Sequence, residues 1–359
     1  MIHVIIGTKA QLIKTAPVLA ELKKRKIPFN FIFTGQHKET MIELRKIFDI
    51  KKPDYILYKG KDITSIGQMV IWATRILWLT LKKKKEIFKN DSQGIVLVHG
   101  DTFSTLLGAL MGKISRLKVG HIESGLRSFN LWHPFPEEIT RLLVFRMSDV
   151  YFCPGAWAVK NLKKYKSQKI NTEANTLLDA LNLALKNESK IKVDIPQEKY
   201  CLVSVHRFEN IFNRSQFEKI IKIIEKTALK MRVLIIMHPP TEKNLHKFGF
   251  YKRLKKNKNI ELRPRYDYFQ FIKLVNNSEF LMTDGGSNQE ESFYLGHPCL
   301  ILREATERKE GLKTNVVLSK FNQKVIDKFI NNPKHYQKKQ VVFKISPSQK
   351  IVDFCRNYI

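Results

Sequence analysis

Strand-like and helix-like segments alternate from the first residue of this chain. Residues 3–7 form a short apolar run, residues 11–24 carry apolar side chains at helical spacing, and residues 30–37 are strand-like again. Strands that alternate with helices of this length predict stacked βαβ units, which build parallel sheets. The expected fold class is therefore α/β.

The alternation continues along the chain and is interrupted once. Three more strands are expected at 96–98, 118–121 and 150–155, whereas residues 165–199 contain one helical stretch followed by a polar connector. A second series then follows, with strands expected at these positions: 200–206, 233–240, 260–263, 279–286 and 298–303. At 359 residues the chain is long enough for two separate cores.

This interruption predicts two domains of similar size. We place the first domain, which carries the candidate catalytic carboxylates, over residues 1–168, and the second, which carries an anion-binding turn, over residues 169–345. Residues 346–359 are expected to form a closing helix that packs back on the first domain. Both domains are expected to be doubly wound, with parallel sheets that face each other across a central cleft.

The chain has a formal net charge of +31, from 64 Lys and Arg residues against 33 Asp and Glu residues. A surplus of this size is typical of proteins that bind nucleic acid or anionic membranes. Here the surplus is mostly Lys scattered along the chain, without interleaved aromatic residues or a nucleic-acid-binding motif. We interpret it as a solvated basic surface, expect no nucleic-acid partner, and expect at most weak peripheral attraction to a membrane.

The cysteines and the start of the chain indicate a reducing compartment. The cysteines show neither a CxxC pair nor Cys/His ligand spacing, so no zinc site and no disulfide framework are expected. Met1 leads directly into a strand, without the basic leader of a signal peptide. Residues 69–81 are apolar but contain Arg75 and fall short of the ~20 residues of a membrane-spanning helix. We expect a cytoplasmic protein in which they form an amphipathic helix.

Ionisable residues are most concentrated between the expected strand at 96–98 and Arg141. Asp101 follows that strand, and Glu123 follows the next one, at 118–121. Ligands of open parallel sheets bind outside the carboxyl ends of the strands. Asp101 and Glu123 are therefore candidates for catalysis.

Two more carboxylates and two histidines belong to the same segment. Glu137 and Glu138 stand next to each other in PFPEE. For Glu138 the alternative is a glutamate that favours the first turn of a helix, where the helix dipole stabilises negative charge. We interpret His121 and His133 as structural histidines.

The second series contains a candidate phosphate-binding turn, TDGGSNQEE, at residues 283–291. Its two glycines allow close backbone approach, and Ser287 and the first amides of the following helix can face a phosphate. The alternative is simply a tight connection between a strand and a helix. Glu290 can complement the helix dipole, whereas Glu291 is the candidate partner of ribose hydroxyls.

Cations for a diphosphate follow expected strands in both series: Lys9, Lys14, Arg207 and Arg308. Each of them alone is compatible with an ordinary surface cation. No GxGxxG follows a strand, which disfavours bound NAD, and no Asp-x-Asp triplet indicates a metal-chelated diphosphate. We expect no metal and no cofactor.

Taken together, these segments resemble the UDP-N-acetylglucosamine 2-epimerase family. The resemblance runs from Gly7 to about Leu318 and rests on these blocks, which occur in the family's order: GTKAQLIKTAPV, FTGQH, HGDTFSTLLGAL, HIESGLRS, PFPEEITR, EANTLLDAL, VSVHRFEN, MHPP, TDGGSNQEE, LGHPCLILREATERKEG and NVVL. So many ordered blocks make the resemblance specific to this family.

The resemblance implies a GT-B fold of two Rossmann-like domains, with UDP bound mainly by the second. It implies that four residues surround the reacting sugar as catalytic residues: Asp101, Glu123, Glu137 and His206. It implies the following substrate- and UDP-binding residues: Lys9, Lys14, His37, Arg141, Arg207, Gly286, Ser287, Glu291 and Arg308. A homodimer and a cell-surface polysaccharide pathway are expected from the resemblance alone.

The chain departs from the family pattern in two places. The usual Arg-Pro-Glu after the first Gly-Thr is here Lys9-Ala10-Gln11, so a carboxylate is replaced by an amide and a bidentate cation by a point charge. The usual Ser-Gly-Gly of the phosphate turn is here Gly285-Gly286-Ser287. These departures concern the choice of substrate rather than the class of reaction.

The implied reaction interconverts UDP-N-acetylglucosamine and UDP-N-acetylmannosamine, or a close analogue, through a glycal-like intermediate. The sugar C2 proton is not next to a carbonyl, so UDP must leave before or while a carboxylate removes that proton. Three alternatives stay open: a hydrolysing epimerase that releases N-acetylmannosamine and UDP, a GT-B glycosyltransferase, and a catalytically silent UDP-sugar-binding protein.

Overall fold

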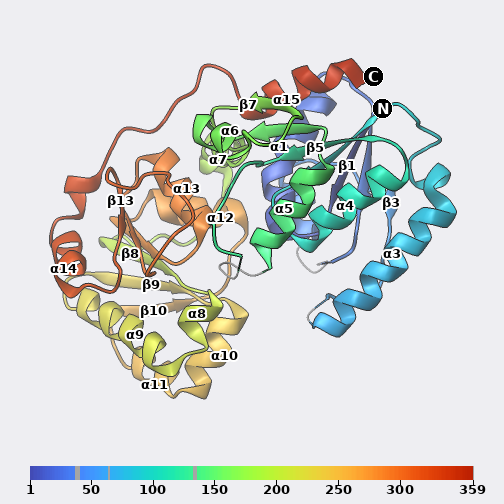
Figure 1. Ribbon diagram of the computed structural model, residues 1–359. Helices are drawn as coiled ribbons and strands as arrows, with labels where there is room; N and C mark the ends of the chain where they lie inside the picture. Colours follow the sequence, from blue (N-terminus) through green and yellow to red (C-terminus); the bar gives the residue numbers. More distant parts are fainter. Residues whose placement is uncertain (37–40, 64, 132–135, 359) are drawn as a thin grey trace. The chain divides into compact units, whose positions relative to one another are not determined.

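The computed structural model describes these residues: 1–36, 41–63, 65–131 and 136–358. They form two compact units, Met1–Ala180 together with Lys344–Ile359, and Leu181–Phe343. Each unit contains one parallel β-sheet flanked by helices (Figure 1). The predicted α/β class with two Rossmann-like parallel sheets is thus confirmed.

The sheet of the first unit has seven strands within the described ranges, in the order β3-β2-β1-β4-β5-β6-β7. Their bounds are β1 (Ile2–Ile6), β2 (Phe29–Phe33), β3 (Tyr55–Ile56), β4 (Ile95–His99), β5 (Lys118–Ile122), β6 (Val150–Cys153) and β7 (Gln168–Asn171). The helices of this unit are α1 (Lys9–Lys24), α2 (Met41–Ile47), α3 (Ile66–Ile87), α4 (Phe103–Ile114), α5 (Glu137–Met147), α6 (Ala156–Asn161) and α15 (Pro347–Cys355), while α7 (Leu177–Lys186) spans the boundary between the units.

The sheet of the second unit has six strands among the residues described, in the order β10-β9-β8-β11-β12-β13. Their bounds are β8 (Tyr200–Ser204), β9 (Arg232–Ile236), β10 (Ile260–Arg263), β11 (Phe280–Thr283), β12 (Cys299–Ile301) and β13 (Val316–Leu318). The helices are α8 (Phe208–Ile211), α9 (Arg214–Ala228), α10 (Pro239–Lys247), α11 (Phe250–Lys255), α12 (Tyr268–Asn276), α13 (Gly286–Leu295) and α14 (Gln323–Asn331).

Both sheets reverse their strand order at one place. In the first unit the first and fourth strands, β1 and β4, are neighbours, and in the second unit the corresponding neighbours are β8 and β11. At such a switch point the connections from the two central strands run in opposite directions, which leaves a crevice at their carboxyl ends. The fold therefore provides one natural binding position in each unit.

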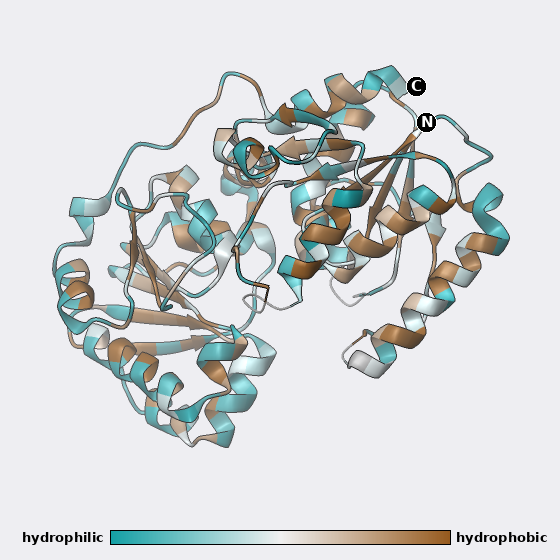
Figure 2. Ribbon diagram, in the orientation of Figure 1, coloured by the Kyte–Doolittle hydropathy of each residue, from teal (hydrophilic) through white to brown (hydrophobic). Residues whose placement is uncertain are grey.

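The central strands are continuous apolar runs because both faces of each sheet are covered. Every residue of β1, β4 and β8 is buried, as expected for parallel strands packed between helix layers. Figure 2 shows the strands of both sheets mainly in the hydrophobic colour. In the first unit, α3 and α4 pack against the face that presents Ile5, Val96 and Val98.

Three strands were not expected from the sequence, and all three lie at sheet edges. β3 has two residues, β7 has the polar sequence QKIN, and β13 has three residues. An edge strand pairs on one side only and is less buried, so it lacks a continuous apolar run. β7 pairs with β6, so the predicted domain boundary between residues 168 and 169 falls inside the first sheet.

The last helix, α15, belongs to the first unit and contacts α1. Ile351 and Val352 of this helix are buried. The backbone N–H of Ser348 donates to Asp179 Oδ2 at 2.8 Å, and the amino terminus of the chain donates to the carbonyl oxygen of Tyr358 at 2.8 Å. The two ends of the chain are thus joined within one unit.

Across the described ranges, no helix is long and apolar enough to cross a membrane. The 22 residues of α3 include the basic run at its carboxyl end, Lys82–Lys85. This helix begins with a capping box in which Ser65 accepts a hydrogen bond from the backbone N–H of Gln68.

We predict that Ile351→Ala lowers the free energy of unfolding of the first unit by about 2–5 kcal/mol, because it removes a buried side chain between α15 and its neighbours. All four tryptophans lie between residues 72 and 157, so tryptophan fluorescence during denaturant titration reports on this unit. Asn357→Ala, at an exposed position after the same helix, should leave the transition unchanged. Equal midpoints for both variants would contradict the prediction.

Candidate active site

The first unit gathers polar side chains at the carboxyl ends of β1, β4 and β5. The turn after β1 requires glycine, since a Cβ on Gly7 would lie 2.0 Å from Ser104 Oγ and 2.1 Å from Thr34 Oγ1. Thr8 caps α1 through its side chain, and Lys9 is the first residue of that helix and is partly exposed. The turn therefore lies close to α4 and presents Lys9 at the switch point.

Gln11 joins this turn to the end of β4. Its Oε1 accepts from the backbone N–H groups of Gly7 at 2.9 Å and Thr8 at 3.1 Å. Its Nε2 donates to the carbonyl oxygen of His99 at 2.9 Å and to Thr105 Oγ1 at 3.0 Å. Both ends of the amide are used, and only 1% of the residue is exposed. A carboxylate here would keep the two acceptor contacts but would lose both donor contacts.

Asp101 is bonded to Arg141 of α5. Arg141 donates to Asp101 Oδ2 from Nε at 2.9 Å and from a terminal nitrogen at 2.5 Å. The arginine side chain is 5% exposed and the aspartate side chain 27% exposed. The aspartate is thus positioned by a buried cation while part of it remains accessible.

The same arginine continues into a second, fully buried ion pair. Glu138 accepts from Arg141 at 3.2 Å, from the Ser128 backbone N–H at 3.0 Å and from Arg127. Burial alone would raise the pKa of Glu138, but the bonds from Arg127 and Ser128 lower it below its ordinary value. Glu138 is therefore more than a first-turn helix glutamate: it fixes the arginine that positions Asp101.

Glu123 is surrounded by nitrogen atoms at the end of β5. Lys14 Nζ and Asn175 Nδ2 each lie 2.5 Å from Glu123 Oε1, and His99 Nε2 lies 3.8 Å from Oε2. The backbone of Glu123 has a φ of 63°, a left-handed conformation that costs about 1–3 kcal/mol for a residue other than glycine. Strained backbone of this kind is found preferentially at functional sites. Lys14, which the resemblance assigns to phosphate, contacts this carboxylate.

His121 has a structural role, as interpreted from the sequence. Its Nε2 lies 2.7 Å from the carbonyl oxygen of Gly100, and its Nδ1 lies 3.0 Å from Ser124 Oγ. Burial lowers the pKa of His121 to about 4, although Asp101 and Glu123 oppose this shift. The neutral ring fixes the Gly100 turn just before Asp101.

Of the remaining candidates in this unit, Glu137 is the first residue of α5, one turn before Arg141. His37 and His133 lie outside the described residues. Across the ranges that the structure describes, no group of three or more His, Cys, Asp or Glu side chains is arranged to bind a metal ion.

In the second unit, Asp284 joins the ends of β8 and β11. This carboxylate is fully buried and accepts hydrogen bonds from the backbone N–H groups of His206 at 3.0 Å and Arg207 at 3.0 Å. Asn210 Nδ2 donates to it at 2.9 Å. These bonds fix the backbone at His206 and Arg207 beside the glycine turn that follows β11.

The glycine turn begins α13, with Gly285 as its N-cap. A Cβ on Gly285 would lie 3.3 Å from His206 Cε1, and one on Gly286 would lie 3.1 Å from Arg308 Nε. Ser287 follows in the first turn of the helix and is partly exposed. The structure thus brings three residues predicted to bind UDP, Gly286, Ser287 and Arg308, close to His206, which was predicted to act at the sugar. They lie at a helix N-terminus, which favours anions.

The two glutamates of α13 have different surroundings. Glu290 is fully buried and accepts from Arg308 at 2.6 Å and from the Tyr294 hydroxyl at 2.9 Å. Glu291 accepts from Asn288 Nδ2 at 3.0 Å. Glu290 therefore neutralises Arg308 beside the turn. Its negative charge near the start of α13 also interacts favourably with the helix dipole.

Glu307 lies between two arginines at the border of the turn. Arg207 donates to its Oε1 at 3.1 Å and Arg303 donates to its Oε2 at 3.0 Å. Burial would raise the pKa of Glu307, but Arg207 and Arg303 outweigh that effect and lower it to about 2. Glu307 is ionised at neutral pH and keeps both guanidinium groups close together.

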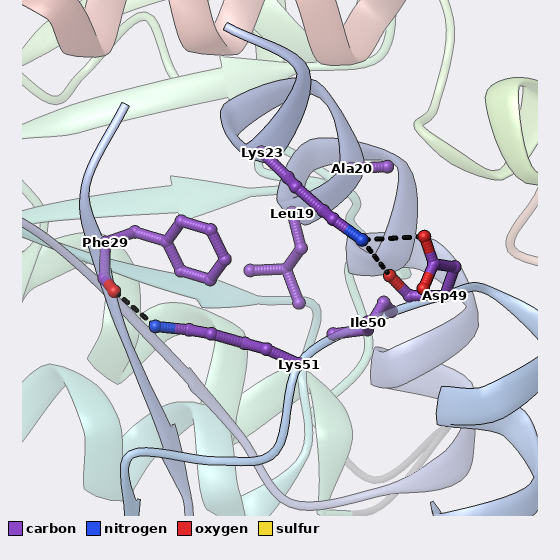
Figure 3. Close-up of a pocket in the computed structure, with 7 residues that line it drawn as sticks. All are labelled: Leu19, Ala20, Lys23, Phe29, Asp49, Ile50 and Lys51. Carbon is purple, nitrogen blue, oxygen red and sulfur yellow. Dashed lines mark hydrogen bonds and ion pairs between the residues drawn. The ribbon is translucent and has the colours of Figure 1, made fainter. Parts of the chain in front are cut away.

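A small cavity of about 230 Å³ lies elsewhere in the first unit (Figure 3). It is lined by Leu19, Ala20, Lys23, Phe29, Asp49, Ile50 and Lys51. The charged side chains that line it contact other residues of the cavity wall. Lys23 Nζ lies 2.6 Å from Asp49 Oδ2, and Lys51 Nζ donates to the Phe29 carbonyl at 2.7 Å. Phe29 is the first residue of β2, so this cavity is at the amino end of that strand, opposite the candidate site.

Comparison with known proteins decides the family. A family model described as UDP-N-acetylglucosamine 2-epimerase matches residues 20–349. The chain is 37% identical to the UDP-N-acetylglucosamine 2-epimerase of Methanococcus maripaludis over 331 residues, which cover 88% of this chain and 86% of that one. It is 33% identical to the Methanocaldococcus jannaschii enzyme of the same name over 347 residues, 90% of each chain. The chain belongs to the UDP-N-acetylglucosamine 2-epimerase family.

Solved structures of the family agree over the whole chain. The Neisseria meningitidis UDP-GlcNAc 2-epimerase bound to UDP-GlcNAc superposes with a TM-score of 0.82 at 29% identity, and 99% of both chains is covered. The M. jannaschii UDP-GlcNAc 2-epimerase in complex with UDP-GlcNAc and UDP gives a TM-score of 0.81 at 28% identity, with 99% of both chains covered. The expected GT-B fold and isomerase class of this epimerase are thereby confirmed.

The sequence patterns did not single out several polar residues of this epimerase. Arg127 bonds to Glu138, Asn175 bonds to Glu123, and Asp284 organises the second unit. The motif HIESGLR contains Arg127, and Asp284 stands directly before the two glycines. Asn175 lies in a loosely matching block, 52 residues from its partner, and no local pattern indicates that contact.

We predict that Gln11→Glu lowers the free energy of unfolding of the first unit by about 1–3 kcal/mol at neutral pH, because the His99 carbonyl loses its buried donor. Gln68→Glu is the matched control, since Gln68 occupies the same third position of the capping box of α3 and is exposed. A carboxylate is favourable at that position. Tryptophan fluorescence during denaturation measures both variants, and a stable Gln11→Glu protein would disprove the role assigned to the amide.

Proposed function

We propose that this epimerase interconverts UDP-N-acetylglucosamine and UDP-N-acetylmannosamine, or a close UDP-N-acetylhexosamine analogue, without net hydrolysis. One observation carries the proposal: two carboxylates, Asp101 and Glu123, follow neighbouring strands and each is bonded to a buried cation. β4 and β5 pair in register, with His99 opposite Ile122. The two ion pairs, Arg141 with Asp101 and Lys14 with Glu123, hold the carboxylates at the strand ends, where a positioned carboxylate can act as a general base.

The proposed reaction begins when the bond between sugar C1 and the UDP oxygen breaks and its electron pair leaves with UDP. A carboxylate from the set Asp101, Glu123 and Glu137 takes the C2 proton, which gives a glycal-like alkene. Delivery of a proton to the other face of C2 and re-addition of the UDP oxygen to C1 complete the epimerisation. No atom or electron is lost in this cycle.

The second unit is proposed to bind UDP. The amides at the start of α13 and the cations Arg207 and Arg308 would stabilise the diphosphate as it leaves. Glu291 is proposed to bind the ribose hydroxyls, and His206 to act at the reacting sugar. Lys9, Lys14, Arg141 and His37 are proposed to contact the substrate from the first unit.

Incubation with UDP-N-acetylglucosamine in deuterated water tests this proposal. We expect proton NMR to show deuterium at C2 together with UDP-N-acetylmannosamine, because the group that returns a proton to C2 carries a deuteron taken from the solvent. Free N-acetylmannosamine with UDP would instead identify a hydrolysing enzyme. No exchange and no product would overturn the assignment for this substrate and leave a transferase to be considered.

Glu123→Gln is the informative variant in the same assay. It should lower turnover and deuterium incorporation by roughly 100-fold or more, in the range expected for loss of a general acid or base, while UDP affinity measured by calorimetry is retained. Glu173→Gln is its control, since Glu173 has a similar φ of 67° and is exposed in the same unit. Full activity of the Glu123 variant would remove Glu123 from the mechanism.

We also propose that the protein is a homodimer joined through α3. This helix exposes a stripe of large apolar side chains, with Ile71 70%, Trp78 57% and Leu81 62% exposed. Together with Thr74 they follow the 3- and 4-residue spacing by which one helix packs along another. Antiparallel pairing of two copies would keep the basic run Lys82–Lys85 of each helix at opposite ends and so limit repulsion.

Replacement of both Trp78 and Leu81 by Glu should convert the dimer into a monomer, because four carboxylates would then lie in the paired surface. Light scattering coupled to size-exclusion chromatography measures the mass of each variant. Leu229→Glu is the control, since Leu229 is 81% exposed but lies in the other unit. A monomeric wild-type protein, or a double variant that remains dimeric, would disprove this surface.

A further inference from the structure

The orientation of the His206 ring is not explained by its nearest charged group. Its Nδ1 lies 3.6 Å from Asp284 Oδ1, beyond hydrogen-bond distance. Asp284 already accepts from two backbone N–H groups and from Asn210. Within the described ranges Nδ1 has no hydrogen-bond partner. Contacts with the ring faces and edges must therefore set its orientation.

One of these contacts is the ring of His238. The two ring centroids are 4.5 Å apart, with an angle of 37° between the planes. His238 follows β9, the neighbour of β8 in the sheet, and is the N-cap of α10. Its Nε2 lies 3.1 Å from Ser204 Oγ. The second ring is therefore bonded to Ser204, the last residue of β8, two residues before His206.

We propose that His238 is a positioning residue for the reaction: it orients the His206 ring toward the glycine turn and shields one face of it from water. The His206 ring also approaches Gly285, where a Cβ would lie only 3.3 Å from Cε1. The ring, whose side chain is 39% exposed, thus contacts a second imidazole and lies close to a backbone without a side chain. This inference rests on the function proposed for His206.

The charged groups around His206 come from three places in the fold. Asp284 follows β11, Arg207 and Glu209 belong to the start of α8, and Arg265 follows β10. Burial lowers the pKa of His206 below its ordinary value, Arg207 and Arg265 lower it further, and Asp284 opposes them. The ring of His238, whose centroid is 4.5 Å from that of His206, covers part of it. His206 is therefore neutral at pH 7, as a group that exchanges protons should be.

His238→Ala tests the inference. Removal of the ring exposes His206 to water, so its pKa should rise toward the ordinary value, and the acidic limb of the kcat profile should move to higher pH. Turnover should fall by roughly 10- to 100-fold, as expected when a reacting group is misplaced, whereas UDP affinity should be retained. NMR titration of the His206 ring measures its pKa without turnover, so the inference can be judged even if the proposed reaction proves wrong.

Two further variants distinguish a positioning role of His238 from a general disturbance of the second unit. His238→Phe keeps an aromatic ring but loses the bond to Ser204, and should restore the His206 pKa and much of the turnover. His246→Ala removes another stacked histidine of the same unit, which lies 4.0 Å from the Tyr251 ring, and should change neither quantity. The inference would be overturned if the His206 pKa were unchanged in His238→Ala. It would also be overturned if that variant raised KM and weakened UDP binding while kcat stayed unchanged.

Discussion

The reversal of strand order between β1 and β4, and between β8 and β11, is the constraint on which the candidate site depends. Where two central parallel strands send their connections in opposite directions, no helix covers their carboxyl ends. Polar side chains can then be placed there without disturbing the apolar core. Asp101, Glu123, His206 and the glycine turn all follow strands at or beside these positions.

At these strand ends, charged side chains are positioned by other charged side chains. Arg141 connects Asp101 with the fully buried Glu138, Lys14 contacts Glu123, and Glu290 contacts Arg308. A buried ion pair contributes little net stability, but loss of one partner leaves an uncompensated charge and costs about 3–5 kcal/mol. Such pairs therefore restrict geometry more than they stabilise the fold, which suits groups that must meet a substrate.

The accuracy of the expectations depended on where each segment lies in the fold. Central strands such as β4 and β8 are covered on both faces and are recognisable as apolar runs, whereas the edge strands β3 and β7 are not. Asp101 and Gly286 were recognisable because they directly follow central strands. Arg303 and His238 were not chosen, because an isolated cation or histidine after a strand is common and its partner lies elsewhere in the chain.

The sequence by itself determined the α/β class, the family and the residue types at the strand ends, since these are local patterns and ordered motifs. Only the tertiary structure decided which groups meet: Gln11 with the His99 carbonyl, Asn175 with Glu123, and His238 with His206. The partners in these three contacts are 88, 52 and 32 residues apart. Contacts over such separations arise when parallel strands pair in register, and no local pattern of side chains records that pairing.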